Sequence, residues 1–230
     1  MLLTLNSRHV GNVYVIQCVG RLVLGEEVKA LEAALDQGAH EYTQFVLNLG
    51  ELNRLDSIAM GLLVRYAERM NKRGGGVRLA APPPFVETLL HMTKLSSVLP
   101  SFPTEDEAIQ SFLKHGSPGE AQAKHGPRVL VVDESADLCV FVRTVLARHG
   151  YDVRSTCSFR DAKTLLQVVE VEYILVGPGT PQLSSGMMLT SLIALAPKAI
   201  ALKLDPDFKI RDAREATNAL LEMFEVGGTI

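Results

Sequence analysis

The chain has 230 residues, 47% of them hydrophobic and 21% charged, which is the balance of a soluble globular protein. This length accommodates two domains of about 100 residues, each with its own core. The 23 Lys and Arg residues against 26 Asp and Glu residues leave a net charge of −3, so direct binding of nucleic acid is not expected. We find neither a secretion signal nor an apolar run of about 18 residues, and therefore expect a cytoplasmic protein without a membrane span.

The cysteines and histidines do not predict a metal site. Cys18, Cys139 and Cys157 are far apart and odd in number, which suits a reducing compartment. Each has apolar neighbours, so we predict buried thiols. The six histidines are scattered without metal-ligand spacing. No cofactor is expected.

The first half of the chain predicts an α/β domain over residues 1–114. Apolar alternation and turn residues indicate strands at 2–5, 13–19, 44–49 and 77–81 and a short extended piece at 101–103. Helices are predicted after Gly25, from Asp56 to the glycines at 74–76, after Pro82-Pro83-Pro84 with Phe85, Leu89 and Met92, and after the capping box that begins at Thr104. Such alternation is typical of helices packed against one sheet.

The stretch after the strand Phe45–Leu49 places a carboxylate and a hydroxyl at the start of a long helix. Asp56 and Ser57 lie at its N-terminus, where either side chain can cap free backbone N–H groups. A structural cap is therefore one interpretation of this pair. The helix is indicated by apolar residues with a period of 3.6, which are Ala59, Leu62, Leu63, Tyr66, Ala67 and Met70.

The other interpretation makes Ser57 a phosphorylation site. A phosphoserine adds roughly −1.5 to −2 charge, which the positive end of a helix dipole tolerates, so the fold would survive the modification. A partner docked over the helix start would instead meet a new dianion beside Asp56 and would dissociate. On this hypothesis Asp56, Ser57, Ile58 and Met60 form the partner-binding surface.

This stretch resembles the anti-sigma-factor antagonist (STAS) family, whose motif Asp-Ser-Ser-Gly-Leu-Gly follows a similar apolar strand. In that family a serine-kinase anti-sigma factor phosphorylates the Ser directly after the Asp, which is Ser57 here. The motif is altered at Ile58 and Ala59, which replace the second Ser and the first Gly. The resemblance implies a STAS fold over 1–114, a kinase and a phosphatase as partners, and a role in transcription regulation.

The second half begins after residues 115–127, which lack periodicity and are interpreted as a linker. The apolar strand Val129–Val132 is followed at once by an acidic pair, Asp133-Glu134, and by a helix with an apolar face that starts at Leu138. A continuous apolar strand followed directly by a helix indicates a parallel sheet covered on both faces.

Residues 128–230 resemble the receiver (CheY-like) domain of response regulators, which has a doubly wound, flavodoxin-like parallel sheet. In a working receiver an acidic pair, here Asp133 and Glu134, holds Mg²⁺ while an Asp after the third strand accepts the phosphoryl group. That acceptor position is Gly177, which has no side chain. We interpret this half as a pseudo-receiver with a vestigial metal site. By the same resemblance, the predicted last helix, Glu215–Phe224, is a candidate docking or homodimer surface.

Three hypotheses follow for the function. The leading one is a non-enzymatic, partner-switching phosphoprotein that binds its kinase while Ser57 is unphosphorylated, with the pseudo-receiver as a second interaction surface. The second is a constitutive adaptor of a signalling assembly, in which Ser57 only caps the helix. The third is a response regulator that phosphorylates itself from a small phosphodonor, and Gly177 argues against it.

Overall fold

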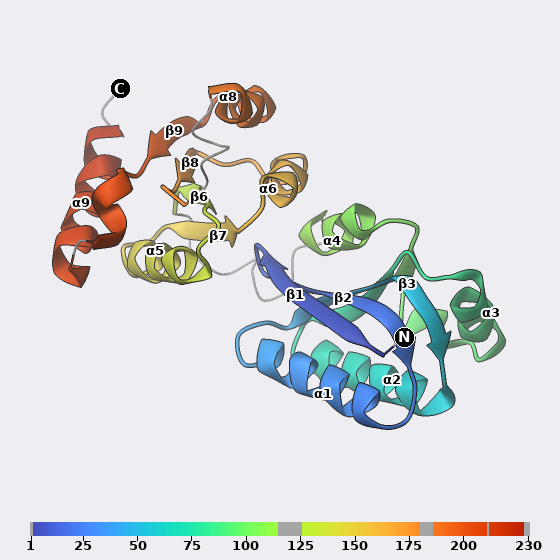
Figure 1. Cartoon of the computed structure of the whole chain (residues 1–230). Coiled ribbons are helices and arrows are strands. Elements are labelled where there is room, and N and C mark those ends of the chain that lie inside the picture. The colour runs from blue at the N-terminus through green and yellow to red at the C-terminus, as the bar shows by residue number, and fades with distance from the viewer. Residues whose placement is uncertain (1, 115–125, 180–185, 211, 228–230) are drawn as a thin grey trace. The chain divides into compact units, whose positions relative to one another are not determined.

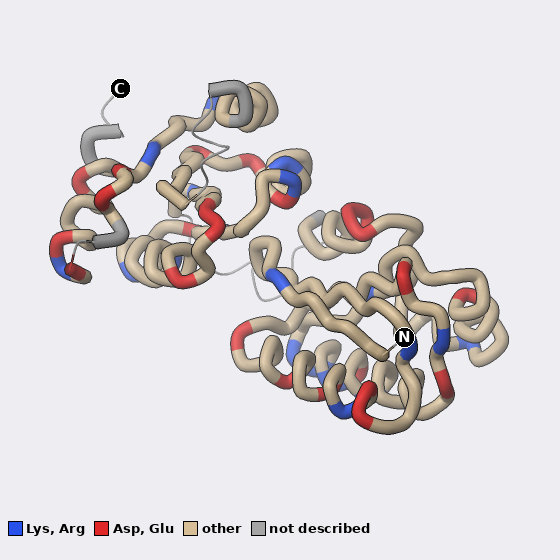
Figure 2. Tube along the Cα trace, viewed as in Figure 1, with Lys and Arg blue, Asp and Glu red and all other residues tan. Residues whose placement is uncertain are grey.

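The computed structural model of the chain describes residues 2–114, 126–179, 186–210 and 212–227. The chain divides into two compact units, Met1–Ala121 and Gln122–Ile230, and most of the predicted linker lies outside the described residues. Acidic and basic residues are intermixed along the trace of each unit (Figure 2). Among the helices described here, none is both long and apolar enough to cross a membrane.

The first unit contains a sheet with helices on both of its faces (Figure 1). Its strands are β1 (Thr4–Val10), β2 (Val13–Leu22), β3 (Gln44–Leu55), β4 (Gly76–Ala80) and β5 (Ser101–Phe102). Its helices are α1 (Glu26–Ala39), α2 (Ser57–Lys72), α3 (Pro84–Met92), the 3-10 turn η1 (Leu95–Ser97) and α4 (Glu105–Lys114). The predicted order of elements is confirmed.

The strands of this unit follow the order β5-β4-β3-β2-β1. β1 pairs antiparallel with β2, whereas β2 with β3, β3 with β4 and β4 with β5 are parallel. Phe45, Leu47 and Leu49 alternate along β3 and join the core formed with α1 and α2, as a period of two requires. The intervening side chains face the opposite side of the sheet, where α4 lies (Figure 1).

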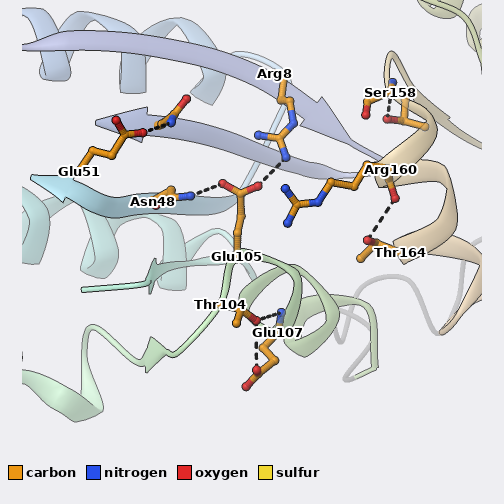
Figure 3. Close-up of polar contacts among 11 residues, drawn as sticks. Arg8, Asn48, Glu51, Thr104, Glu105, Glu107, Ser158, Arg160 and Thr164 are labelled. Carbon is orange, nitrogen blue, oxygen red and sulfur yellow. Dashed lines mark hydrogen bonds and ion pairs between the residues drawn. The ribbon is translucent and has the colours of Figure 1, made fainter. Parts of the chain in front are cut away.

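Helix α4 is fixed to the sheet through its first turn. The Thr104 half of the predicted capping box is present, because Thr104 Oγ1 accepts the Glu107 N–H at 3.2 Å. The same hydroxyl donates to the Glu107 carboxylate at 3.1 Å. Glu105 is 9% exposed and binds Arg8 of β1 at 2.6 Å and Asn48 of β3 at 2.7 Å (Figure 3). This carboxylate therefore joins α4 to two strands.

Two packing expectations differ from the structure. On α3 the residues that enter the core are Val86 and Leu90, whereas Phe85 and Met92 are 41% and 79% exposed. The three prolines start the helix at Pro84, and this start sets which face meets the sheet. Among the cysteines, Cys18 and Cys139 are buried as predicted, but Cys157 is partly exposed because it follows the end of a strand.

The second unit alternates strands and helices. Its strands are β6 (Arg128–Val132), β7 (Asp152–Thr156), β8 (Tyr173–Val176) and β9 (Ile200–Lys203). Its helical segments are α5 (Ala136–Arg148), α6 (Phe159–Leu166), α8 (Gly186–Leu195), the 3-10 turn η3 (Pro206–Ile210) and α9 (Ala213–Gly227). Within residues 204–210 and 212–227, the structure contains no further strand.

All strand pairs of this unit are parallel, in the order β7-β6-β8-β9. β6 is central, which explains its unbroken apolar run, since both faces of a parallel strand are covered. Helices α5 and α9 contact each other, as do α6 and α8 (Figure 1). Ala216, Leu220 and Phe224 of α9 are buried in the core shared with α5, so the predicted last helix packs on this unit through its apolar residues.

Candidate functional site

The candidate site lies where β2 and β3 of the first unit end at the same edge of the sheet. Leu22 and Leu55, the last residues of these parallel strands, are register partners. The connection from β2 to α1 therefore lies beside the connection from β3 to α2. The backbone N–H of Asp56 donates to the carbonyl of Leu22 at 3.2 Å, which extends the ladder to the first residue of the site.

Asp56 joins these two connections through its carboxylate. Oδ1 accepts the backbone N–H of Ala59 at 2.9 Å and makes Asp56 the N-cap of α2. Oδ2 accepts the backbone N–H of Leu24 at 2.7 Å. The Ala59 hydrogen bond is the main cause that lowers the pKa of Asp56 below its usual value of 3.8. Asp56 thus caps the helix and holds the neighbouring loop.

Ser57 is the first residue of α2 and has an exposed side chain. Across the part of the chain that the structure describes, its hydroxyl forms no hydrogen bond, since the capping role belongs to Asp56. The interpretation of Ser57 as the helix cap is therefore wrong. An exposed hydroxyl at a helix N-terminus is open to a modifying enzyme, and a phosphate there faces the positive end of the helix dipole.

Two exposed apolar side chains lie in the segments that flank this hydroxyl. Ile58, the next residue, is 48% exposed, and Leu24, whose backbone binds Asp56, is 69% exposed. Leu24 was missed by the sequence analysis, because it reads as the last residue of an apolar strand. The sequence signal for this position was Gly25, because a glycine directly after an apolar run marks the end of the extended segment. In the structure Gly25 has a φ of 141°.

The expectation that Met60 belongs to the partner-binding surface is wrong. Met60 is 5% exposed and joins the core of the first unit. The helical period explains this, since Met60, Leu63 and Ala67 follow one another at offsets of 0, 3 and 7 and share a buried face of α2. Asp56, Ser57 and Ile58 remain at the surface, so the structure brings together these three predicted residues and Leu24.

In the second unit, Asp133 follows β6 and is completely buried. Its Oδ1 accepts the backbone N–H of Ser135 at 2.7 Å, and its Oδ2 accepts that of Gly179 at 2.6 Å. A Cβ placed on Gly177 would lie 2.2 Å from Oδ2. Gly177 therefore provides the space into which the Asp133 carboxylate fits, a contact that no sequence pattern indicated.

Among the described residues, Asp133 and Glu134 are not part of a cluster of three or more potential metal ligands. Glu134 is exposed, whereas Asp133 is buried and already accepts two backbone N–H groups. Within the described ranges, no third His, Cys, Asp or Glu joins this pair at ligand distances. The magnesium site at Asp133 and Glu134 stays a prediction, while the structural role of Asp133 is evident from its hydrogen bonds.

Comparisons with known proteins identify the first unit. The model of the STAS domain matches residues 4–108, which include β1 to β5 and the Asp56-Ser57 site. The N-terminal part of the chain is thus a STAS domain. This match ends before the second unit, for which a receiver assignment remains a proposal. None of the curated proteins compared with the chain matches it.

Solved structures that resemble the chain cover just under half of it. An anti-sigma factor antagonist from Mycobacterium paratuberculosis shares 24% identity over 47% of this chain and 92% of its own, with a TM-score of 0.44. The phosphorylated form of the Bacillus cell fate determinant SpoIIAA shares 22% identity over 47% of this chain and 98% of its own, with a TM-score of 0.41. A STAS protein from Planctomyces limnophilus shares 20% identity over 46% and 96%, with a TM-score of 0.41.

Proposed function

We propose that the STAS domain is a phosphorylation switch that binds a serine-kinase anti-sigma factor while Ser57 is unmodified and releases it when Ser57 is phosphorylated. A phosphatase would restore binding. The observation that carries this proposal is that Asp56, and not Ser57, caps α2. The exposed Ser57 hydroxyl therefore has no structural role at the start of the helix.

The phosphate would act on binding and not on folding. Ser57 is the first residue of a long helix, so a dianion there is favoured by the helix dipole, by about 0.3–1 kcal/mol for an exposed charge. The Asp56 carboxylate is held by Ala59 and Leu24 and keeps its place beside the new charge. A docked partner would have to desolvate both anions, which weakens the complex.

The surface that the partner would cover combines apolar and polar groups. Leu24 and Ile58 offer exposed aliphatic side chains, and Ser57 and Asp56 supply polar groups between these two segments. Full burial of an exposed aliphatic side chain contributes roughly 1.5–3 kcal/mol. Because Ile58 and Leu24 are 48% and 69% exposed, docking would gain about half to two thirds of that amount from each of these anchors. Such a surface is complementary to a partner that places a shallow apolar patch over Leu24 and Ile58, next to the Ser57 hydroxyl.

The test compares the wild type with Ser57→Ala and Ser57→Asp as purified full-length baits in an extract of the source cells. Intact-mass and peptide analysis of the wild type from growing cells should find one phosphate, on Ser57. Ser57→Ala should retain a kinase and Ser57→Asp should lose it. Ser96→Asp is the matched control, because Ser96 is exposed on η1 and gains the same charge away from the site.

Either of two results would contradict the switch. One is retention of the same proteins by wild type, Ser57→Ala and Ser57→Asp with no phosphate on Ser57, which would favour the constitutive adaptor. The other is loss of the partner by Ser96→Asp as well as by Ser57→Asp, which would show that any added negative charge on the domain weakens binding. Replacement of Leu24 or Ile58 by Ser should weaken capture of the kinase by the unphosphorylated domain, because each removes an exposed aliphatic side chain beside Ser57.

For the second unit we propose a pseudo-receiver that serves as an interaction surface. The strand order β7-β6-β8-β9, or second-first-third-fourth along the chain, matches the first four positions of the flavodoxin-like order 2-1-3-4-5. The proposal is supported by the place of Gly177 directly after β8 and against Asp133, which leaves no carboxylate nucleophile there. Incubation with acetyl phosphate and Mg²⁺ should leave residues 128–230 unlabelled, and a hydroxylamine-sensitive label on a carboxylate within them would contradict the proposal.

A further inference from the structure

The second unit places two cysteines side by side although they are distant in the sequence. Cys139 lies in the first turn of α5, and Cys157 follows the last residue of β7. Their sulfur atoms lie within 4.8 Å of each other. Because β6 and β7 are adjacent parallel strands, the segments that follow them meet at one edge of the sheet, and this edge holds both thiols.

The two thiols differ in their surroundings. Cys139 is fully buried, and its sulfur lies 3.4 Å from the carbonyl oxygen of Asp133 and 3.9 Å from that of Thr156. Cys157 is partly exposed, so a small reagent can reach it. This is the arrangement of an accessible attacking thiol with a second thiol directly behind it.

The acidity of the pair has the same asymmetry. The Cys139 thiol acts as a hydrogen donor toward Cys157 and lowers the pKa of Cys157, although burial and the carboxylates of Asp133 and Asp161 oppose this. The pKa of Cys139 is raised by its position beside Cys157 and by burial. Cys157 is therefore the thiol that ionises first, and the thiolate is the reactive form.

We propose that Cys139 and Cys157 form a reversible redox site that closes to an intramolecular disulfide when a hydroperoxide oxidises Cys157. Closure requires the sulfurs to approach from within 4.8 Å to the S–S bond length of about 2 Å, a distance that a rotamer change at one cysteine can cover.

The chemistry proceeds in two steps. The Cys157 thiolate attacks one oxygen of the hydroperoxide, the O–O bond breaks, and the other oxygen leaves and takes up a proton, so that Cys157 becomes a sulfenic acid. The Cys139 sulfur then attacks the Cys157 sulfur, the S–O bond breaks, and the hydroxide leaves as water with the Cys139 proton. Two electrons pass from the thiol pair to the peroxide, and a dithiol reductant reverses the result.

Mass spectrometry of the full-length chain under hydrogen peroxide provides the test. The intact mass should fall by two hydrogens without dimer formation. Tryptic digestion without reduction should join the peptide of residues 129–143, which carries Cys139, to that of residues 155–160, which carries Cys157. Dithiothreitol should restore both free peptides.

Cys18 is the internal control. It is fully buried in the first unit, and burial raises its pKa to about 12. Modification of Cys18 should be at least about tenfold slower than closure of the pair. Cys18→Ser should leave the disulfide unchanged and Cys157→Ser should abolish it, whereas Cys139→Ala should stop at a Cys157 sulfenic acid that dimedone traps.

Three outcomes would overturn the proposal. They are oxidation of Cys157 to a sulfinic acid without the joined peptides, a disulfide between two chains, and closure that is as fast in concentrated urea as in the folded chain. The wild-type peptide map and the urea comparison need no variant, so they decide the question even if a substitution at the buried Cys139 prevents folding.

Discussion

The two units use an aspartate in the same way at the end of a strand, but with different consequences. Asp56 after β3 and Asp133 after β6 each accept two backbone N–H groups, one from the segment that follows and one from a neighbouring connection. In the first unit the next residue, Ser57, keeps an exposed hydroxyl. In the second unit the carboxylate is completely buried, and Gly177 lies against it.

This difference shows that an aspartate at the end of a strand can leave the next side chain exposed or can fill the space at the sheet edge itself. Asp56 satisfies the backbone at the surface, so it leaves the side chain of Ser57 free for chemistry. Asp133 fills the space into which a side chain at position 177 would extend. The same kind of contact therefore leaves an exposed side chain at one sheet edge and fills the space at the other. The predictions below test this contrast, in decreasing order of expected effect.

The largest effect is expected from Asp133→Ala. This change leaves the backbone N–H groups of Ser135 and Gly179 without their acceptor, at a cost of about 2–4 kcal/mol in the free energy of unfolding. Hydrogen exchange should accelerate in β6 and β8 but not in β2 and β3, because the loss is confined to the second unit. Equal protection of β6 and β8 in both proteins would show that the buried carboxylate is dispensable.

Gly177→Ala should cost about 1–3 kcal/mol, because its Cβ would meet the Asp133 carboxylate. A double-mutant cycle with Asp133→Ala isolates this contact, and the cost of Gly177→Ala should shrink once the carboxylate is removed. Gly61→Ala is the control, since nothing lies within 4 Å of a Cβ there, and should stabilise α2 by about 0.5–1 kcal/mol. Additive costs in the cycle would contradict the steric explanation.

Asp56→Ala should destabilise the first unit by about 1–2 kcal/mol, because α2 loses its cap and the loop at Leu24 loses its acceptor. Ser57→Ala should change stability by less than about 0.5 kcal/mol. Urea unfolding, with hydrogen exchange of the α2 amides to locate the change, measures both. The reverse ranking would return the capping role to Ser57 and would remove the basis of the proposed switch.

The smallest effect is the pH dependence of the Asp56 cap. Hydrogen bonds lower the pKa of Asp56 below 3.8 in the folded state, so the unfolded chain binds more protons in this window and stability rises with pH. The difference in unfolding free energy between wild type and Asp56→Asn should be fully present at neutral pH and should decline as the pH falls below 3.8. The corresponding difference for Ser57→Ala should not depend on pH, since its hydroxyl does not titrate in this range.

The sequence by itself determined the elements and most of the core. Periodicity gave α2 with its buried face, the apolar run of β6 gave a parallel strand covered on both sides, and the capping box at Thr104 gave the start of α4. These features depend on residues near one another in the chain, so a local pattern contains them. The order of strands and helices followed from the same patterns.

Only the tertiary structure decided which side chains are free to act. Asp56 and Ser57 are equally plausible caps from sequence, and the loop held at Leu24 shows that Asp56 has this role. Gly177 was seen in the sequence as a missing acceptor, but its contact with Asp133 depends on two parallel strands ending together. The approach of Cys139 to Cys157 has the same origin. Such contacts join segments far apart in the chain, and only the pairing of strands brings these segments together.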